Sequence, residues 1–163
     1  MLYFVHSTHY LEADLDLNKL TLGDKIVAGA GILLFLDLLI LPWHHISVSI
    51  LGITAASFNR SGLQSPNALW GWLAWIITIA LVASVILRKL TTVKLPDLPI
   101  AWAQATFFAT IAVAALLLIK LFAETSSLGI GFWIAIILAA GMVYGGFLVS
   151  REPATAADAG PAV

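Results

Sequence analysis

Four long apolar stretches constrain the fold of this chain more than any other feature. They cover residues 26–43, 69–87, 100–122 and 128–149. The hydrocarbon core of a bilayer is about 30 Å thick, so a helix that crosses it needs roughly 17–25 mostly apolar residues. Backbone groups in lipid find their hydrogen-bond partners within a helix. The sequence therefore predicts an all-α membrane protein with a four-transmembrane-helix bundle.

The composition favours the same class of protein. Hydrophobic residues make up 61% of the chain and charged residues 10%, whereas soluble domains have about 25% charged residues. A chain of 163 residues is too short to enclose so much apolar surface in one water-soluble core. The lipid bilayer is therefore the expected surrounding of the chain.

Several function classes lack their usual sequence signals. The net charge is -1 and no basic block occurs, so nucleic acid is not an expected partner. The chain has no cysteine, which removes disulfides, thiolate metal ligands and thiol catalysis. We find no G-x-G-x-x-G, Walker or H-E-x-x-H pattern. The sequence thus predicts no cofactor, no metal and no enzymatic activity.

The distribution of basic residues predicts the orientation in the membrane, because Lys and Arg are enriched in cytoplasmic loops. The chain has eight basic residues. Two of them lie on the other side: Arg60 in the connection after the first stretch, and Lys120 near the outer end of the third. The remaining six lie near the termini or between the second and third stretches: Lys19, Lys25, Arg88, Lys89, Lys94 and Arg151. Both termini are therefore predicted to be cytoplasmic in a multi-pass cell-membrane protein. We divide the chain into a polar arm (1–25), a transmembrane domain (26–150) and a disordered tail (151–163).

Tryptophans agree with this orientation, because Trp is enriched at membrane interfaces. Trp102 lies at the predicted inner side, and five others lie at the predicted outer ends: Trp43, Trp70, Trp72, Trp75 and Trp133.

Asp37 is the most unusual residue of the first stretch, which reads LLFLDLLILPW around it. A charged residue within a membrane helix marks a functional site by default and costs about 2.5–3.5 kcal/mol at the helix centre. Lys120 is the other charge within a stretch, and both lie towards the outer ends. An ion pair between Asp37 and Lys120 would offset the desolvation of each. Two alternatives stay open. In the first, Lys120 reaches the interface while Asp37 is protonated or bonded to Thr78, Ser84 or a backbone group. In the second, Asp37 and Lys120 serve ion or proton transport.

The connection between the first two stretches is too apolar for an ordinary solvated loop. Its centre, ISVSILGITAASF, is too short to cross a bilayer. The I-S-V-S-I alternation predicts a strand or an interfacial segment, with a re-entrant hairpin as a further alternative. This connection is the partly structured outer loop of the predicted fold. At its start, His44 and His45 form a candidate outer polar cluster with Glu124.

Small residues follow a regular spacing in the last stretch. Gly131, Ala135 and Ala139 are four residues apart, and Gly141 and Gly145 form a G-x-x-x-G pair. Such spacings allow two helix backbones to approach closely. They predict helix packing, either within the chain or with another subunit.

The stretch KLTLGDKIVAGAGILLFLDLLILPWHH combines a polar start at 20–25, a Gly-, Ala- and Leu-rich helix at 29–41 and a Pro-Trp pair at 42–43. It resembles the opening of small, uncharacterised four-span membrane proteins of high-GC Gram-positive bacteria. The resemblance implies a bacterial inner membrane and assigns no catalytic residue.

Our leading functional hypothesis is a non-enzymatic scaffold or accessory subunit of a membrane complex, with a membrane-protein partner or a homo-oligomer as its assembly. The alternative is a small transporter or proton-coupled channel that uses Asp37 and Lys120.

Overall fold

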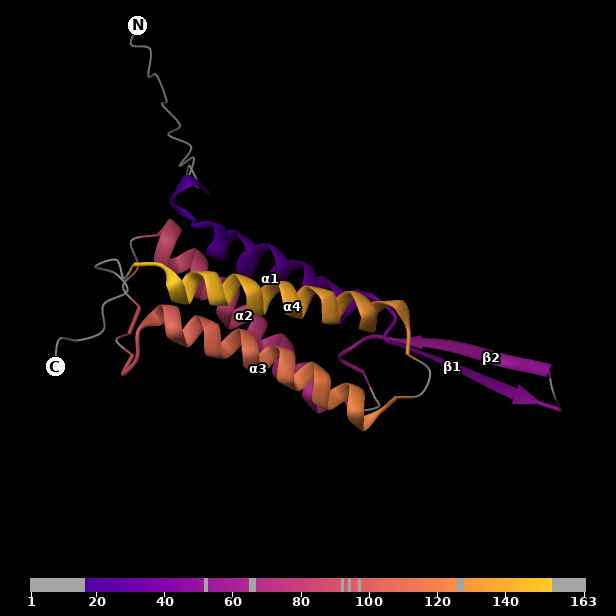
Figure 1. The fold of residues 1–163 in the computed structure, drawn as a ribbon. Coiled ribbons are helices and arrows are strands. Elements are labelled where there is room, and N and C mark those ends of the chain that lie inside the picture. The colour runs from indigo at the N-terminus through magenta and orange to yellow at the C-terminus, as the bar shows by residue number, and fades with distance from the viewer. Residues whose placement is uncertain are drawn as a thin grey trace, which may run out of the picture.

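The protein is mostly helical, with four α-helices and one β-hairpin (Figure 1). A computed structural model describes residues 17–51, 53–64, 67–91, 93, 95–96, 98–125 and 128–153. The elements in chain order are a short 3-10 helix Leu17–Lys19, α1 Leu22–Ile40, β1 His44–Ile50, β2 Ile53–Arg60, α2 Ala68–Leu90, α3 Trp102–Ala123 and α4 Ile130–Arg151. Most of the predicted polar arm and tail lies outside the described residues.

Both ends of α1 follow from local chemistry. The Thr21 hydroxyl accepts a hydrogen bond from the Asp24 backbone N–H at 3.1 Å, and the Asp24 carboxylate accepts one from the Thr21 backbone N–H at 3.3 Å. This capping box starts the helix at Leu22. Pro42 lacks an N–H and pushes the preceding residue, Leu41, into an extended conformation. The first helix is therefore 22–40, earlier at both ends than the predicted stretch 26–43.

The four helices lie side by side in a ring. The helix α1 packs against α2 and α4, and α3 packs against the same two helices (Figure 1). Chain neighbours are therefore also neighbours in space. The start of α1 and the end of α4 lie at one end of the ring, which we call the terminal end. The hairpin extends from the other, which we call the hairpin end.

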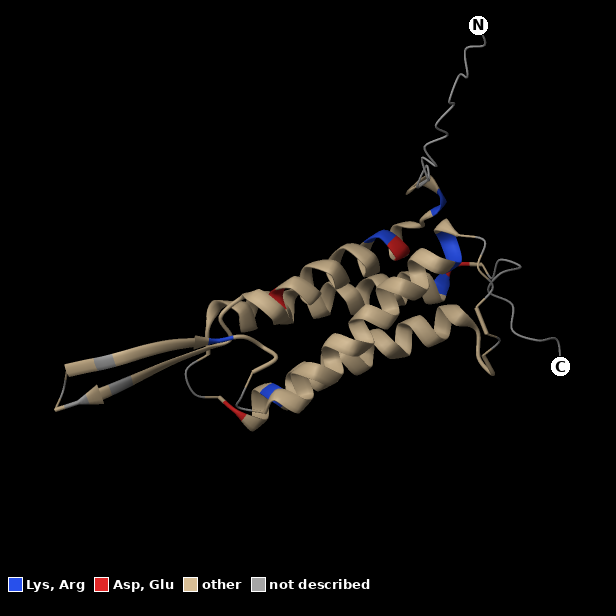
Figure 2. Ribbon diagram, turned by 180° about the vertical axis from the view of Figure 1, so that it is seen from behind, with Lys and Arg blue, Asp and Glu red and all other residues tan. Residues whose placement is uncertain are grey.

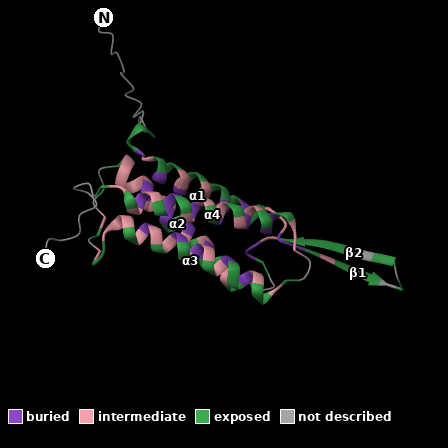
Figure 3. Ribbon diagram, viewed as in Figure 1, coloured by how far each residue is buried: buried purple, intermediate pink, exposed green. Residues whose placement is uncertain are grey.

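Each helix carries both buried and exposed residues (Figure 3), and apolar side chains occur in both groups. The centre includes Leu34, Leu38, Val113 and Met142, all fully buried. Large apolar side chains that face outward occur on each helix, among them Leu33, Ile76, Phe108 and Ile137. Within the described residues, α2, α3 and α4 are long and apolar enough to cross a membrane. The fold is thus consistent with a multi-pass membrane protein.

Small residues let α4 approach α1 closely. A Cβ atom added to Gly145 would lie 2.8 Å from Cγ2 of Ile26, and one added to Gly131 would lie 2.9 Å from Cβ of Leu41. A Cβ atom added to Gly141 would instead meet only Cβ of Ala30, at 3.9 Å. The predicted packing residues Ala135 and Ala139 are buried in the same core. Gly131 and Gly145 therefore pack within the chain, the first of the two alternatives.

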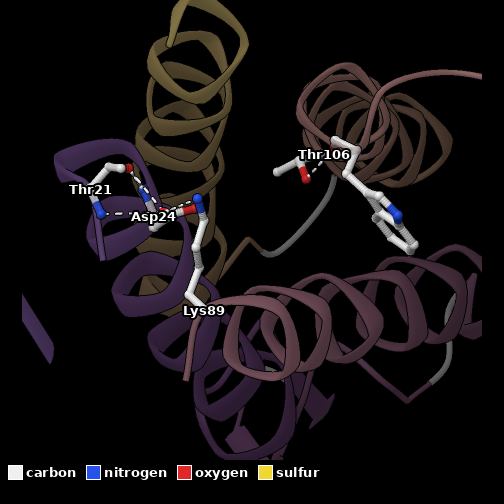
Figure 4. Close-up of polar contacts among 5 residues, drawn as sticks. Thr21, Asp24, Lys89 and Thr106 are labelled. Atoms are coloured by element: carbon white, nitrogen blue, oxygen red, sulfur yellow. Dashed lines mark hydrogen bonds and ion pairs between the residues drawn. The ribbon is translucent and has the colours of Figure 1, made fainter. Parts of the chain in front are cut away.

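Charged residues concentrate at the two ends of the ring (Figure 2). At the terminal end, Nζ of Lys89 lies 3.7 Å from Oδ2 of Asp24, which also takes part in the capping box (Figure 4). This ion pair joins the last turn of α2 to the first turn of α1. The capping box joins residues three apart in the chain, whereas Lys89 reaches Asp24 only through the packing of α2 against α1.

Candidate functional site

The strands β1 and β2 form a β-hairpin at the hairpin end of the ring. Its strands pair antiparallel from His44 with Arg60 to Ile50 with Ile53, with an irregularity between Val48 and Ser49. Both strands run beyond the helices (Figure 1). The sequence allowed a strand, an interfacial segment or a re-entrant hairpin for this connection, and the strand prediction is confirmed.

The hairpin lies beyond the helices, and several of its large apolar side chains are exposed. Leu51 is 97% exposed, Ile53 74% and Phe58 58%. In the part of the chain that the structure describes, the sheet has two strands, so each strand has one open edge beyond the bridge between His44 and Leu128. An isolated two-stranded hairpin is marginally stable in water, and open edges can pair with another chain. The hairpin therefore presents both exposed apolar side chains and open backbone edges.

Backbone hydrogen bonds fix the base of the hairpin to the helices. The Trp43 N–H donates to the Arg60 carbonyl at 2.8 Å, which closes the base of the hairpin. The Trp43 carbonyl accepts from the Gly129 N–H at 2.7 Å, and the Pro42 carbonyl accepts from the Gly131 N–H at 3.1 Å. The segment that leaves α1 is thus bound both to the end of β2 and to the start of α4.

The side chain of Trp43 lies at the centre of this junction and is fully buried. Its indole Nε1–H donates to Oδ2 of Asp37 at 2.9 Å. Nζ of Lys120 lies 5.9 Å from the centroid of its ring. The ring of Phe132 meets it edge to face, with centroids 5.7 Å apart. We call Asp37, Trp43 and Lys120 the Trp43 junction.

The predicted ion pair between Asp37 and Lys120 is not formed in the described structure. Both residues are 1% exposed, and both contact Trp43 instead. The physical reason is the shape of indole, whose N–H edge suits a carboxylate and whose ring face suits a cation. Because Pro42 ends the helix, Trp43 can fold back onto the side chain of Asp37. Trp43 lies at the hairpin end of the ring, and its side chain is buried within the protein.

Lys120 also connects α3 to the start of α2. Its Nζ donates to the backbone carbonyl of Asn67 at 3.3 Å. The Asn67 amide Nδ2 donates in return to the Ala123 carbonyl at 3.3 Å. Asn67 has a φ of 55°, in the left-handed region that Asn tolerates better than most residues. Lys120 is therefore buried between elements and does not extend to an interface.

The strand separates the two histidines of the predicted outer polar cluster with Glu124. Successive side chains of a strand point to opposite faces. His44 is accordingly 2% exposed, whereas His45 is exposed with its Nδ1 2.8 Å from Oδ1 of Asn59. The Glu124 backbone N–H ends α3 by donating to the carbonyls of Lys120 and Leu121. No group of three His, Asp or Glu that could hold a metal ion occurs among the described residues.

Sequence reasoning found two residues of the junction and missed the third. Asp37 and Lys120 were visible because charges within apolar stretches are rare. Trp43 was assigned to the outer interface because it stands at the outer end of the first stretch and Trp is enriched at membrane interfaces. The proline was the available signal, since it predicts that the residues after it leave the helical path.

Comparisons of the chain with known protein families, with curated proteins and with solved structures give no match.

Proposed function

We propose that this chain is a non-enzymatic integral membrane protein that acts as a scaffold or accessory subunit, with the β1–β2 hairpin as its contact surface for a membrane-protein partner. The observation that carries the proposal is the hairpin that extends beyond the helices with Leu51, Ile53 and Phe58 exposed. Large exposed apolar patches on a protein mark interaction sites. A fixed base favours binding, because less conformational freedom is lost when the partner binds.

We further propose that α1 is a fourth span and that both termini are cytoplasmic. The outward face of α1 carries exposed apolar side chains, among them Leu33, Leu39 and Ile40. Its 19 residues give a length of about 28 Å, close to the thickness of the hydrocarbon core. The charges of Asp24 and Asp37 face protein partners. The resemblance of the first helix to bacterial proteins supports a bacterial inner membrane.

The contacts of the Trp43 junction support a structural role for Asp37 and Lys120 over the transport alternative. Each charge has a protein partner that joins two segments of the chain. An asparagine at position 37 would still accept the indole N–H but could not carry a proton. Vesicles reconstituted with the Asp37→Asn variant should therefore show the same ion and proton flux as the wild type, whereas transport through Asp37 would give a flux that this variant loses.

Shortening the hairpin tests the contact surface. Residues 47–57 are replaced by Asn-Gly, a pair that favours a tight hairpin turn. The pairs His44–Arg60 and Ile46–Phe58 at the base are kept. Wild-type and shortened chains are purified in gentle detergent from native membranes. We expect one protein to copurify in stoichiometric amount with the wild type and to be lost with the shortened chain.

Site-directed cross-linking then checks direct contact, because the chain has no cysteine of its own. Leu51→Cys, modified with a photoreactive maleimide, should cross-link to the same partner. The matched control is Arg151→Cys at the terminal end, which should not. Equal copurification with both chains, or no cross-link from position 51, would refute the hairpin as contact surface. Labelling the same two variants with a membrane-impermeant maleimide tests the orientation, since only Leu51→Cys should react from outside intact cells.

A further inference from the structure

A second feature lies between α2 and α3, in the half of these helices nearest the terminal end. A groove of about 450 Å³ separates the two helices there. Its walls include Ile76, Ala80 and Leu87 from α2, with Ala105 and Ala109 from α3. Ile76 is 54% exposed, so the groove lies at the outward surface, which faces lipid if α2 and α3 cross the membrane.

The groove presents an apolar surface even where its walls contain hydroxyl groups. The Ser84 hydroxyl donates to the Leu81 carbonyl of its own helix at 2.8 Å. The Thr106 hydroxyl likewise donates to the Trp102 carbonyl at 2.8 Å (Figure 4). Both groups are thereby satisfied within their helices. The groove therefore suits a hydrocarbon chain better than a polar ligand.

The length of the groove matches one leaflet of a bilayer. Its walls on α2 run from Ile76 to Leu87, which at 1.5 Å per residue is about 16 Å. Half of a hydrocarbon core is about 15 Å. An acyl chain of a phospholipid in the leaflet at the terminal end would thus lie along the groove, with its headgroup beyond Leu87.

A cation lies at this headgroup end. The Arg88 guanidinium is 5.5 Å from the centroid of the Trp102 ring, and Trp102 is part of the groove wall. The neighbouring Lys89 is directed to α1, where it pairs with Asp24. Among the described residues that line the groove, none is acidic. Arg88 places a positive charge beside the groove wall, which favours a negatively charged headgroup.

We propose that this groove binds an anionic phospholipid, with one acyl chain between α2 and α3 and the phosphate at Arg88. The site is independent of the hairpin and of its partner. A basic residue near a membrane surface contributes about 1 kcal/mol to the attraction of anionic lipid, which corresponds to a roughly fivefold difference in binding.

Native mass spectrometry of the full chain in mild detergent tests the site. The probes are phosphatidylglycerol and phosphatidylcholine with identical acyl chains. Arg88→Gln should lower the binding of phosphatidylglycerol about fivefold and leave phosphatidylcholine unchanged. Its matched control is Arg151→Gln, because Arg151 also lies over an aromatic ring, 4.8 Å from the centroid of Phe147, but not at the groove.

A second variant tests the acyl chain independently. Ala80→Trp adds a large side chain at an exposed position of the groove wall and should lower the binding of both lipids. Its control is Ala140→Trp, at an exposed position of α4 outside the groove. Equal phosphatidylglycerol binding by Arg88→Gln and Arg151→Gln would overturn the headgroup assignment, as would an equal loss of both lipids in Arg88→Gln. Equal binding by Ala80→Trp and Ala140→Trp would overturn the groove as the acyl-chain site.

Discussion

Replacement of Trp43 by Phe tests the Trp43 junction most directly. The substitution keeps an aromatic ring but removes the N–H that donates to Asp37 Oδ2 at 2.9 Å. Hydrogen bonds within membrane proteins average about 0.6 kcal/mol and reach about 1.7, and those to a charged acceptor are about twice as strong as neutral ones. We therefore expect a loss of about 1–2 kcal/mol from the hydrogen bond. The smaller ring at a fully buried position adds about 1–2 kcal/mol of lost packing.

A double-mutant cycle separates these two contributions. Trp43→Phe leaves the Asp37 carboxylate without its donor, and Asp37→Leu leaves the indole N–H without its acceptor. The double variant has neither unsatisfied group. Its loss in free energy of unfolding should therefore be smaller than the sum of the two single losses by about 1–2 kcal/mol. The assay is unfolding in mixed micelles followed by circular dichroism. Trp133→Phe is the control, because Trp133 is 57% exposed, and it should change the free energy of unfolding by less than about 0.5 kcal/mol.

Additive losses within about 0.5 kcal/mol would refute the reasoning, because they would mean that Asp37 and Trp43 do not depend on each other. An equal loss of unfolding free energy in Trp133→Phe and Trp43→Phe would also refute the reasoning. The loss would then not depend on the contacts of Trp43 with Asp37 and the core.

Three further predictions concern stability, and the same unfolding assay measures each. Gly145→Val should cost about 1–3 kcal/mol because an added Cβ would lie 2.8 Å from an isoleucine of α1. Gly141→Ala should be neutral or stabilise by up to about 1 kcal/mol, because its Cβ would meet only Ala30, at an ordinary contact distance of 3.9 Å. Equal effects of the two would contradict the close approach of α4 to α1. Thr21→Ala should cost about 1 kcal/mol through loss of the helix cap, and Thr21→Ser should restore most of it, while a Thr21→Ala variant as stable as wild type would show that the cap contributes nothing. The chain with the shortened hairpin should have the same free energy of unfolding as the wild type, because the Trp43 junction remains. A much lower free energy of unfolding would instead assign the hairpin a role in folding.

The β-hairpin shows how far pattern alone reaches. The alternation I-S-V-S-I predicted a strand from local propensity, and a strand is what forms. The pattern gave no information about the direction in which the hairpin extends from the helices. That direction depends on hydrogen bonds between residues far apart in the chain, such as Gly129 with Trp43. The histidines show the same difference. Their identity was visible, but the strand places His44 and His45 on opposite faces and separates them.

The sequence by itself determined the class of the protein and the main helices, since length, apolar composition and the capping residues at Thr21 and Asp24 are local properties of the chain. It also identified Asp37 and Lys120 as residues that need partners, because a buried charge is costly wherever the chain folds. Only the tertiary structure decided what those partners are. Indole has both an N–H edge and a ring face, so Trp43 contacts the carboxylate and the ammonium at once. This arrangement requires the chain to turn back after Pro42, and the stability of that turn comes from contacts with α4 and β2 that no local pattern contains.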